Sequence, residues 1–206
     1  MPAKRIFDPG QLPEGFSYES DFLSENDESE LLRRIESLQF KPYELRGYFA
    51  RRRVATYGTN YGTLAPKEDE KPRPIPDFLL AVRERAAAFA GVAADEIVEA
   101  MVTEYSPGTP IGWHRDRPQF GTIVGISLAS PCRMRLKAYQ GEGKIISQIL
   151  EPRSIYSIQG VARSEFQHSI PAAEKLRYSI TFRTLATKHA NKRTKNPVNK
   201  NDPRAA

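Results

Sequence analysis

The carboxy-terminal half of the chain is dominated by short stretches with strand-like composition, and this pattern limits the possible folds more than any other. The stretches are rich in β-branched and aromatic residues, and breaks such as Ser106-Pro-Gly and Gly141-Glu-Gly separate them. Short, closely spaced strands are typical of antiparallel sheets that pack face to face. We expect strands over residues 99–105, 122–128, 132–138, 145–150, 154–158 and 177–185.

Two helices are expected ahead of these strands. Ser24 can cap the first helix, Asp27 and Glu28 suit its positive end, and four apolar side chains share one face. Pro76 fits the first turn of the second helix, which Gly91 ends. Helices followed by short strands predict an α+β fold, a double-stranded β-helix (jelly roll) backed by N-terminal helices. The apolar positions of the first helix are Leu31, Leu32, Ile35 and Leu38.

The chain of 206 residues is long enough for one catalytic domain with short extensions. We place this domain at residues 21–186, after an extended N-terminal segment at residues 1–20. Residues 41–74 mix aromatic with basic side chains, a composition that suits strands or a substrate-recognition lid over a site. Residues 187–206 hold six basic residues against Asp202, most of the net charge of +6, and this predicts a disordered basic tail.

Composition also bears on the compartment. No apolar run approaches the roughly 18 residues that a membrane span needs, so we expect no membrane association. The first residues carry charge but lack the apolar segment of a secretory signal. Cys132 is the only cysteine, which excludes an intrachain disulfide and favours a reducing compartment. These features predict a cytoplasmic protein, and we expect it to be a monomer.

The motif His114-Arg115-Asp116 places a histidine and a carboxylate two residues apart. On an extended chain both side chains point to the same side. The chain has only three histidines, and a loop can aim His168 back at this pair. Two histidines and one carboxylate form the ligand set of non-haem iron(II) sites with open coordination positions. Because an isolated His-x-Asp is common without a metal, and because zinc can use the same ligands, the assignment depends on neighbouring motifs.

The stretch from Arg177 to Arg183 alternates strictly between polar and apolar residues. As a strand it places both arginines and Ser179 on one face and its apolar residues on the other. Such a strand can simply expose its arginines to water. Iron(II) sites with open positions, however, need an oxidisable cosubstrate, and arginine binds carboxylates through two parallel hydrogen bonds. A dicarboxylic 2-oxo acid meets both requirements.

With these motifs the chain resembles the AlkB family of iron(II)- and 2-oxoglutarate-dependent dioxygenases. The match runs from about Val102 to Leu185, and weaker similarity extends toward the N-terminus. The resemblance implies an oxidoreductase that uses Fe(II), 2-oxoglutarate and O2 to oxidise an N-alkyl group, after which an aldehyde leaves. The implied iron ligands are His114, Asp116 and His168, and the implied 2-oxoglutarate contacts are Arg177, Arg183, Tyr105, Ser179 and Thr103.

The resemblance also implies different roles for the two arginines, and the sequence departs from the family pattern at two positions. Arg177 is expected at the distal carboxylate of 2-oxoglutarate, and Arg183 near the end that binds iron. Thr103 occupies a place where many nucleic-acid-repairing members have an asparagine that contacts the cosubstrate. Repair members also tend to carry an acidic residue just after the iron-binding aspartate, whereas an arginine and a proline follow Asp116 here. These departures concern the substrate more than the catalysis.

Candidate substrate contacts come from several parts of the chain. Arg53, Tyr57 and Tyr61 combine cations for phosphates with aromatic rings for stacking on bases, as recognition of single strands or flipped bases requires. The same residues also suit a solvated basic edge above core tyrosines. Trp113 can shield the pocket or belong to an ordinary core. Arg163 can position the substrate or the nearby loop, or form a structural salt bridge.

The leading hypothesis is oxidative dealkylation of N-alkylated bases in nucleic acid, with DNA repair ahead of RNA demethylation. Three basic residues, Arg133, Arg135 and Lys137, share one face of an expected strand and suit either a phosphate track or an exposed strand face. One alternative is a protein hydroxylase or demethylase of the same superfamily. Another is a noncatalytic nucleic-acid-binding module that keeps the fold.

Overall fold

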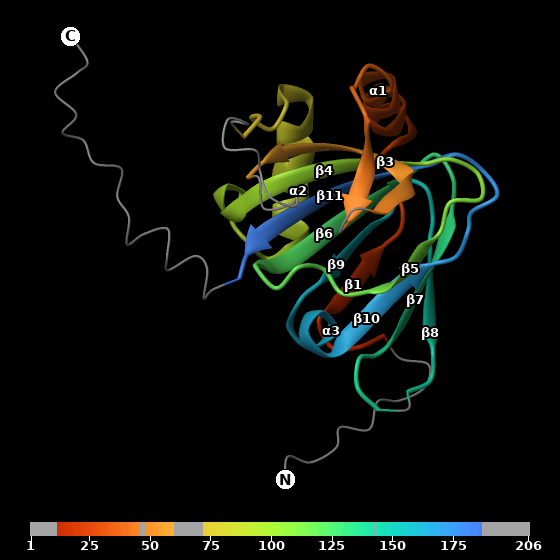
Figure 1. Ribbon diagram of the computed structural model, residues 1–206. Coiled ribbons are helices and arrows are strands. Elements are labelled where there is room, and N and C mark those ends of the chain that lie inside the picture. The colour runs from red at the N-terminus through yellow and green to blue at the C-terminus, as the bar shows by residue number, and fades with distance from the viewer. Residues whose placement is uncertain (1–11, 46–47, 60–71, 142, 187–206) are drawn as a thin grey trace, which may run out of the picture.

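The computed structural model describes residues 12–45, 48–59, 72–141 and 143–186, which form two antiparallel β-sheets that face each other. Helices cover the outer face of the larger sheet, and the smaller sheet packs on its inner face (Figure 1). This arrangement confirms the predicted jelly roll with helices behind it.

The larger sheet has seven strands in the order β1-β9-β6-β11-β4-β3-β2, and the smaller sheet has four in the order β5-β10-β7-β8. The strands of the larger sheet are β1 (Phe16–Glu19), β2 (Lys41–Leu45), β3 (Tyr48–Gly58), β4 (Ile97–Tyr105), β6 (Phe120–Leu128), β9 (Ile155–Ile158) and β11 (Arg177–Leu185). The strands of the smaller sheet are β5 (Ile111–His114), β7 (Cys132–Ala138), β8 (Ile146–Leu150) and β10 (Phe166–Ile170).

Both predicted helices are present. The Ser24 side chain caps α1 (Glu25–Glu36), and Asp27 completes a capping box by accepting from the backbone of Ser24. A 3₁₀ turn, η2 (Asp77–Leu79), leads into α2 (Leu80–Ala90), and Gly91 ends that helix with φ 66°, in the left-handed region that favours glycine. Two shorter elements follow, the 3₁₀ turn η3 (Ala94–Glu96) and the helix α3 (Gly160–Glu165).

Three strands, β1, β5 and β10, were not assigned from the sequence. Strand β1 pairs with β9, so residues 16–19 of the expected N-terminal segment belong to the larger sheet. Strands β2 and β3 occupy the other edge of that sheet, and they lie in the segment 41–74, whose composition suits strands or a lid. Residues 60–71 of the lid segment and the basic tail at 187–206 lie outside the described residues.

The two faces of strand β11 belong to different parts of the interior. Tyr178, Ile180 and Phe182 pack in the core between the larger sheet and the helices. The alternate side chains point between the two sheets, where Arg177 is only 1% exposed and Arg183 only 8% exposed. Burying an arginine is unfavourable unless its charge has a partner, so the exposed-strand reading is wrong and this face marks a site.

In the part of the chain that the structure describes, none of the helices combines the length and the apolar character needed to span a bilayer.

Candidate active site

The pairing of β5 with β10 brings the two histidines together. His168 lies directly opposite His114 in the strand register, and their ring centroids are 4.3 Å apart. We expected a loop to carry His168, but the residue lies within β10, which pairs with β7 on its other side. A strand held on both sides fixes the direction of the ring more firmly than a loop would.

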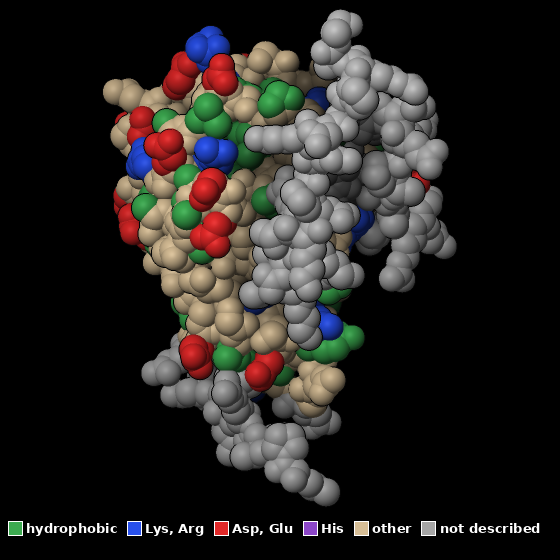
Figure 2. All heavy atoms as spheres, turned by 90° about the vertical axis from the view of Figure 1, so that its left-hand side faces the viewer, with side chains coloured by type: hydrophobic (Ala, Val, Ile, Leu, Met, Phe, Trp, Pro, Cys, Tyr) green, Lys and Arg blue, Asp and Glu red, His purple; other side chains and the backbone are tan. Residues whose placement is uncertain are grey.

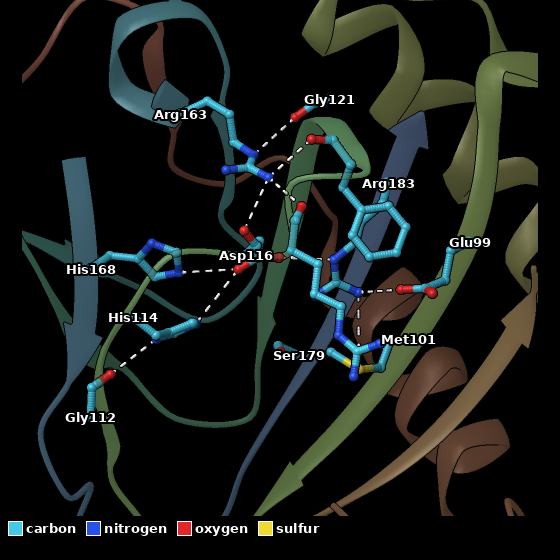
Figure 3. Close-up of polar contacts among 12 residues, drawn as sticks. Glu99, Met101, Gly112, His114, Asp116, Gly121, Arg163, His168, Ser179 and Arg183 are labelled. Atoms are coloured by element: carbon cyan, nitrogen blue, oxygen red, sulfur yellow. Dashed lines mark hydrogen bonds and ion pairs between the residues drawn. The ribbon is translucent and has the colours of Figure 1, made fainter. Parts of the chain in front are cut away.

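Asp116 completes the cluster from the loop just beyond β5. Its Oδ1 atom lies 3.6 Å from Nε2 of His114 and 3.6 Å from Nε2 of His168 (Figure 3). The three ligand atoms lie within 4.8 Å of one another, close enough for one metal ion to reach all three. The structure thus assembles the two-histidine, one-carboxylate set that leaves coordination positions open on iron(II).

The protonation states of these groups suit metal binding. The Nδ1 atom of His114 lies 3.0 Å from the Gly112 carbonyl oxygen, a hydrogen bond that leaves Nε2 free as a ligand. Burial, reinforced by the nearby His114, lowers the pKa of His168 to about 4, so its ring is neutral at neutral pH. Burial tends to raise the pKa of Asp116, but the charge of Arg183 and the two histidines hold that pKa well below its usual range.

Arg183 orients Asp116 from behind. Its Nε donates to Oδ2 of Asp116 at 3.0 Å, which leaves Oδ1 facing the histidines. Its Nη1 donates to Oε1 of Glu99 at 2.7 Å, because Glu99 lies opposite Arg183 in the register of β4 and β11. Glu99 was not identified as a site residue from the sequence. It lies four residues before Thr103 on the same strand, so the two side chains share one face. Burial raises the pKa of Glu99, and the charge of Arg183 opposes that rise.

Arg177 lies farther along the same face of β11, and no carboxylate among the described residues forms an ion pair with it. Its guanidinium carbon is 4.8 Å from the centroid of the Tyr105 ring, and its Nε donates to Oγ of Ser127 at 3.3 Å. The buried Nη1 atom has no hydrogen-bond partner among the described residues. The hydroxyl groups of Tyr105 and Ser179 lie 3.3 Å apart beside it, and the buried Thr103 hydroxyl also has no described partner. A cation with a free donor next to hydroxyl groups fits the carboxylate of a dicarboxylic acid.

A cavity of about 330 Å³ joins these two clusters. Its lining includes the three candidate metal ligands together with Arg177 and Arg183. Tyr43 of β2 and Arg52 of β3 also contribute to the lining, and the Arg52 guanidinium lies 4.0 Å from the centroid of the Tyr43 ring. The volume is within the range of small-molecule sites, about 300–1,000 Å³.

Strand alternation corrects the predicted substrate contacts from β3. Tyr57 is buried in the core between the larger sheet and the helices, so it does not reach the cavity. Arg53 points to the same face as Tyr57 and forms a two-bond ion pair with Glu104, at 2.8 Å for each bond. The basic residue of this run that does reach the cavity is Arg52. Tyr61 lies outside the described residues.

The structure also places Trp113 and Arg163. Trp113 is among the residues that line the cavity, and its ring also contacts Arg135 and Lys137, whose side chains alternate with buried ones on β7. The Arg163 side chain forms no salt bridge with the residues that the structure describes. Instead it donates to the backbone carbonyls of Gly121, Asp116, Arg117 and Phe120, at 2.7–3.2 Å (Figure 3). Arg163 therefore holds the loop that carries Asp116.

We predict that Arg163→Met weakens divalent metal binding by about 10- to 100-fold, the usual effect of losing a group that orients a ligand. The loop that carries Asp116 would lose all four carbonyl contacts while every metal ligand stays in place. Titration of the metal-free protein with Co²⁺ measures the affinity. Arg33→Met, on the exposed surface of α1, is the control, and equal affinity of the two variants would contradict the positioning role.

The jelly roll and the partly buried histidine–carboxylate cluster are typical of the class of non-haem iron oxygenases. A sequence profile described as the 2OG-Fe(II) oxygenase superfamily matches residues 15–183, and the chain belongs to this superfamily. Members of this superfamily are oxidoreductases of the dioxygenase type that use Fe(II), 2-oxoglutarate and O2. The buried donor of Arg177 and the ligand cluster fit these groups.

Curated relatives support the AlkB resemblance. The chain is 39% identical over 90 residues to "Alpha-ketoglutarate-dependent dioxygenase alkB homolog 7, mitochondrial" of Bos taurus, and 38% identical over 90 residues to the Mus musculus protein of the same description. Each match spans 43% of this chain and 40% of the relative. A longer match, 27% identical over 191 residues, links 83% of the chain to 85% of "Uncharacterized protein L905" of Acanthamoeba polyphaga mimivirus.

Solved structures share the fold at low sequence identity. The protein in "The structure of OsALKBH1" superposes with a TM-score of 0.64 at 16% identity, covering 84% of this chain and 100% of that one. A prolyl hydroxylase from Trichoplax adhaerens, solved with a peptide fragment of hypoxia inducible factor, gives a TM-score of 0.62 at 16% identity and covers 86% of each chain. A Pseudomonas putida prolyl-4-hydroxylase gives 0.56 at 16% identity, covering 84% of this chain and 93% of that one.

Proposed function

We propose that this enzyme oxidatively dealkylates N-alkylated bases in nucleic acid, with DNA repair ahead of RNA demethylation. The observation that carries the proposal is the cavity itself, because it joins the candidate metal ligands to a lining that includes the stacked pair Tyr43 and Arg52. An aromatic ring and a cation beside an oxidising centre suit a base with its phosphate. The AlkB resemblance implies the N-alkyl chemistry.

His114, Asp116 and His168 would hold the iron, and the residues around Arg177 would hold the distal carboxylate of 2-oxoglutarate. When bound, these groups supply O2 activation coupled to conversion of 2-oxoglutarate into succinate and carbon dioxide. The protein's own contribution is positional. Arg183 keeps Oδ2 of Asp116 occupied so that Oδ1 faces the metal position, and the cavity between the sheets limits access of water to it.

The proposal is tested by supplying the iron-loaded protein with oligonucleotides that carry N-methylated bases or none. We expect the methylated strand to stimulate succinate formation and to release formaldehyde, while the unmodified strand does neither. Arg52→Gln should raise KM for the oligonucleotide several-fold, and Arg51→Gln, on the other face of the same strand, should not. Turnover of 2-oxoglutarate without any stimulation or formaldehyde would contradict dealkylation. Stimulation by a peptide instead would favour the protein hydroxylase alternative.

The cellular setting is also part of the proposal. A single buried cysteine, Cys132, agrees with a reducing compartment, and we propose a cytoplasmic monomer. The two mammalian relatives are described as mitochondrial, so fractionation of cells is the direct test. Light scattering of the purified protein tests the monomer.

A further inference from the structure

We propose that the outer face of the smaller sheet binds the phosphate backbone of a single-stranded nucleic acid beside the opening of the active-site cavity. This inference rests on the proposed function, because it takes the substrate to be nucleic acid. The residues concerned lie on the side of the sheet that points away from the metal ligands.

The first observation is the charge of the smaller sheet. Its strands β5, β7, β8 and β10 contain no aspartate or glutamate, whereas β7 contains Arg133, Arg135 and Lys137. The residues that alternate with these three are buried in the core between the sheets, so the basic side chains point outward. A sheet face with three cations and no carboxylate attracts polyanions.

The second observation is how these cations are held. The Arg135 guanidinium carbon lies 5.0 Å from the centroid of the Trp113 ring, and the Lys137 Nζ lies 4.5 Å from it. Nearby, the Arg115 guanidinium carbon lies 3.7 Å from the centroid of the Tyr139 ring. An aromatic ring stabilises a cation without cancelling its charge. These side chains are therefore ordered while their positive charge remains available to a ligand.

Several basic residues of the helices are neutralised instead. Arg33 and Arg34 pair with Glu30 on α1, and Arg85 pairs with Asp27. Among the residues that the structure describes, no carboxylate forms an ion pair with the cations of β7 or with Arg115. The side that lies at the left of Figure 1 carries acidic side chains scattered among few basic ones, as Figure 2 shows. The smaller sheet thus differs from this helical part of the surface in its unneutralised charge.

The third observation is the position of this face relative to the cavity. Strand β5 is the edge of the smaller sheet, β2 is the edge of the larger sheet, and residues from both edges line the cavity. Trp113 immediately precedes the candidate ligand His114 on β5. A single strand of nucleic acid that lies across the outer face can pass over the β5 edge and turn one base into the cavity, while its phosphates stay beside β7.

The test uses the full-length, metal-free protein and a fluorescein-labelled oligo(dT), so that binding is measured apart from catalysis. Arg133→Gln/Lys137→Gln removes two outward cations, and Arg33→Gln/Arg34→Gln removes two cations from α1, on the other side of the larger sheet. Anisotropy gives the affinity at several salt concentrations. The quenching of Trp113, the only tryptophan, reports whether the oligonucleotide lies at the β5 edge, where the Trp113 ring contacts Arg135 and Lys137.

We expect the β7 variant to bind at least tenfold more weakly at low salt. Its slope of log affinity against log salt should fall by about 1.4, since each phosphate contact on a single strand contributes about 0.7. The α1 variant should match the wild type. Equal affinities for the two variants, or binding without Trp113 quenching, would overturn the inference. Binding at this face without dealkylation of methylated strands would uphold the surface and refute the proposed reaction, so the two failures are distinguishable.

Discussion

His114→Ala is expected to abolish 2-oxoglutarate turnover without unfolding the protein. The change removes one of the three candidate ligands. It leaves the ion pair between Asp116 and Arg183 in place, because Nε2 of His114 faces Oδ1 of Asp116 whereas Arg183 binds Oδ2. Asp116→Ala should abolish turnover equally, but it also leaves Arg183 without one of its two carboxylates. Because breaking a buried ion pair costs about 3–5 kcal/mol, this second variant should also be clearly less stable.

The two variants are compared by succinate formation and by urea unfolding of the metal-free proteins. A common loss of turnover with unequal stability would establish that Asp116 serves both as a ligand and as the partner of Arg183. Turnover that survives in His114→Ala would contradict the ligand set. Equal stability of the two metal-free variants would show that Glu99 alone compensates Arg183.

Arg177→Met is expected to weaken 2-oxoglutarate binding by about 10- to 150-fold, which corresponds to the 1.5–3 kcal/mol of a hydrogen bond to a charged group. The same change should stabilise the unliganded protein. Arg177 is 1% exposed and its Nη1 has no described partner, so an apolar side chain of similar length removes an uncompensated buried charge. A site built for a ligand has this signature, in which one substitution raises stability and lowers affinity.

Thermal unfolding with and without 2-oxoglutarate, in the presence of a redox-inert divalent metal, measures both effects of Arg177→Met. We expect a higher Tm without 2-oxoglutarate and a much smaller rise when it is added. Tyr105→Phe is a milder control, because it removes only the hydroxyl beside Ser179. If Arg177→Met kept the full rise in Tm, the carboxylate would have to bind elsewhere.

The sequence predicted the central strands and helices well because their patterns are long and regular. The alternation from Arg177 to Arg183 correctly placed both arginines on one face, and the Ser24 cap correctly located α1. Strands β5 and β10 were missed because they are short and broken by polar ligands, Ile-Gly-Trp-His and Phe-Gln-His-Ser-Ile. Their pairing in register depends on contacts far apart in the chain, which no local pattern reveals.

Substrate contacts were harder to predict than ligands, because their identification depends on which face of a strand is buried. Arg52 and Arg53 are neighbours on β3, so their side chains point to opposite faces of the sheet. Arg52 therefore reaches the cavity, whereas Arg53 pairs with Glu104. For Arg163 the sequence left three roles open, since its partners are backbone carbonyls, which every residue possesses. Glu99 already belonged to the predicted strand at residues 99–105, and the alternation of that strand could have placed it on the same face as Thr103.

The chain of contacts from Glu99 through Arg183 to Asp116, together with the isolated Arg177, also sets the electrical balance of the cavity. In this inner group the two carboxylates balance the two guanidiniums when both histidines are uncharged, while Arg52, Arg115 and Arg117 add positive charge to the rest of the cavity lining. A divalent metal ion alone breaks that balance, and a dianionic acid restores it. Each ligand should therefore raise the affinity for the other, since this coupling is reciprocal. The protein would then disfavour the states in which only the metal ion or only the acid is bound, and this would require no conformational change.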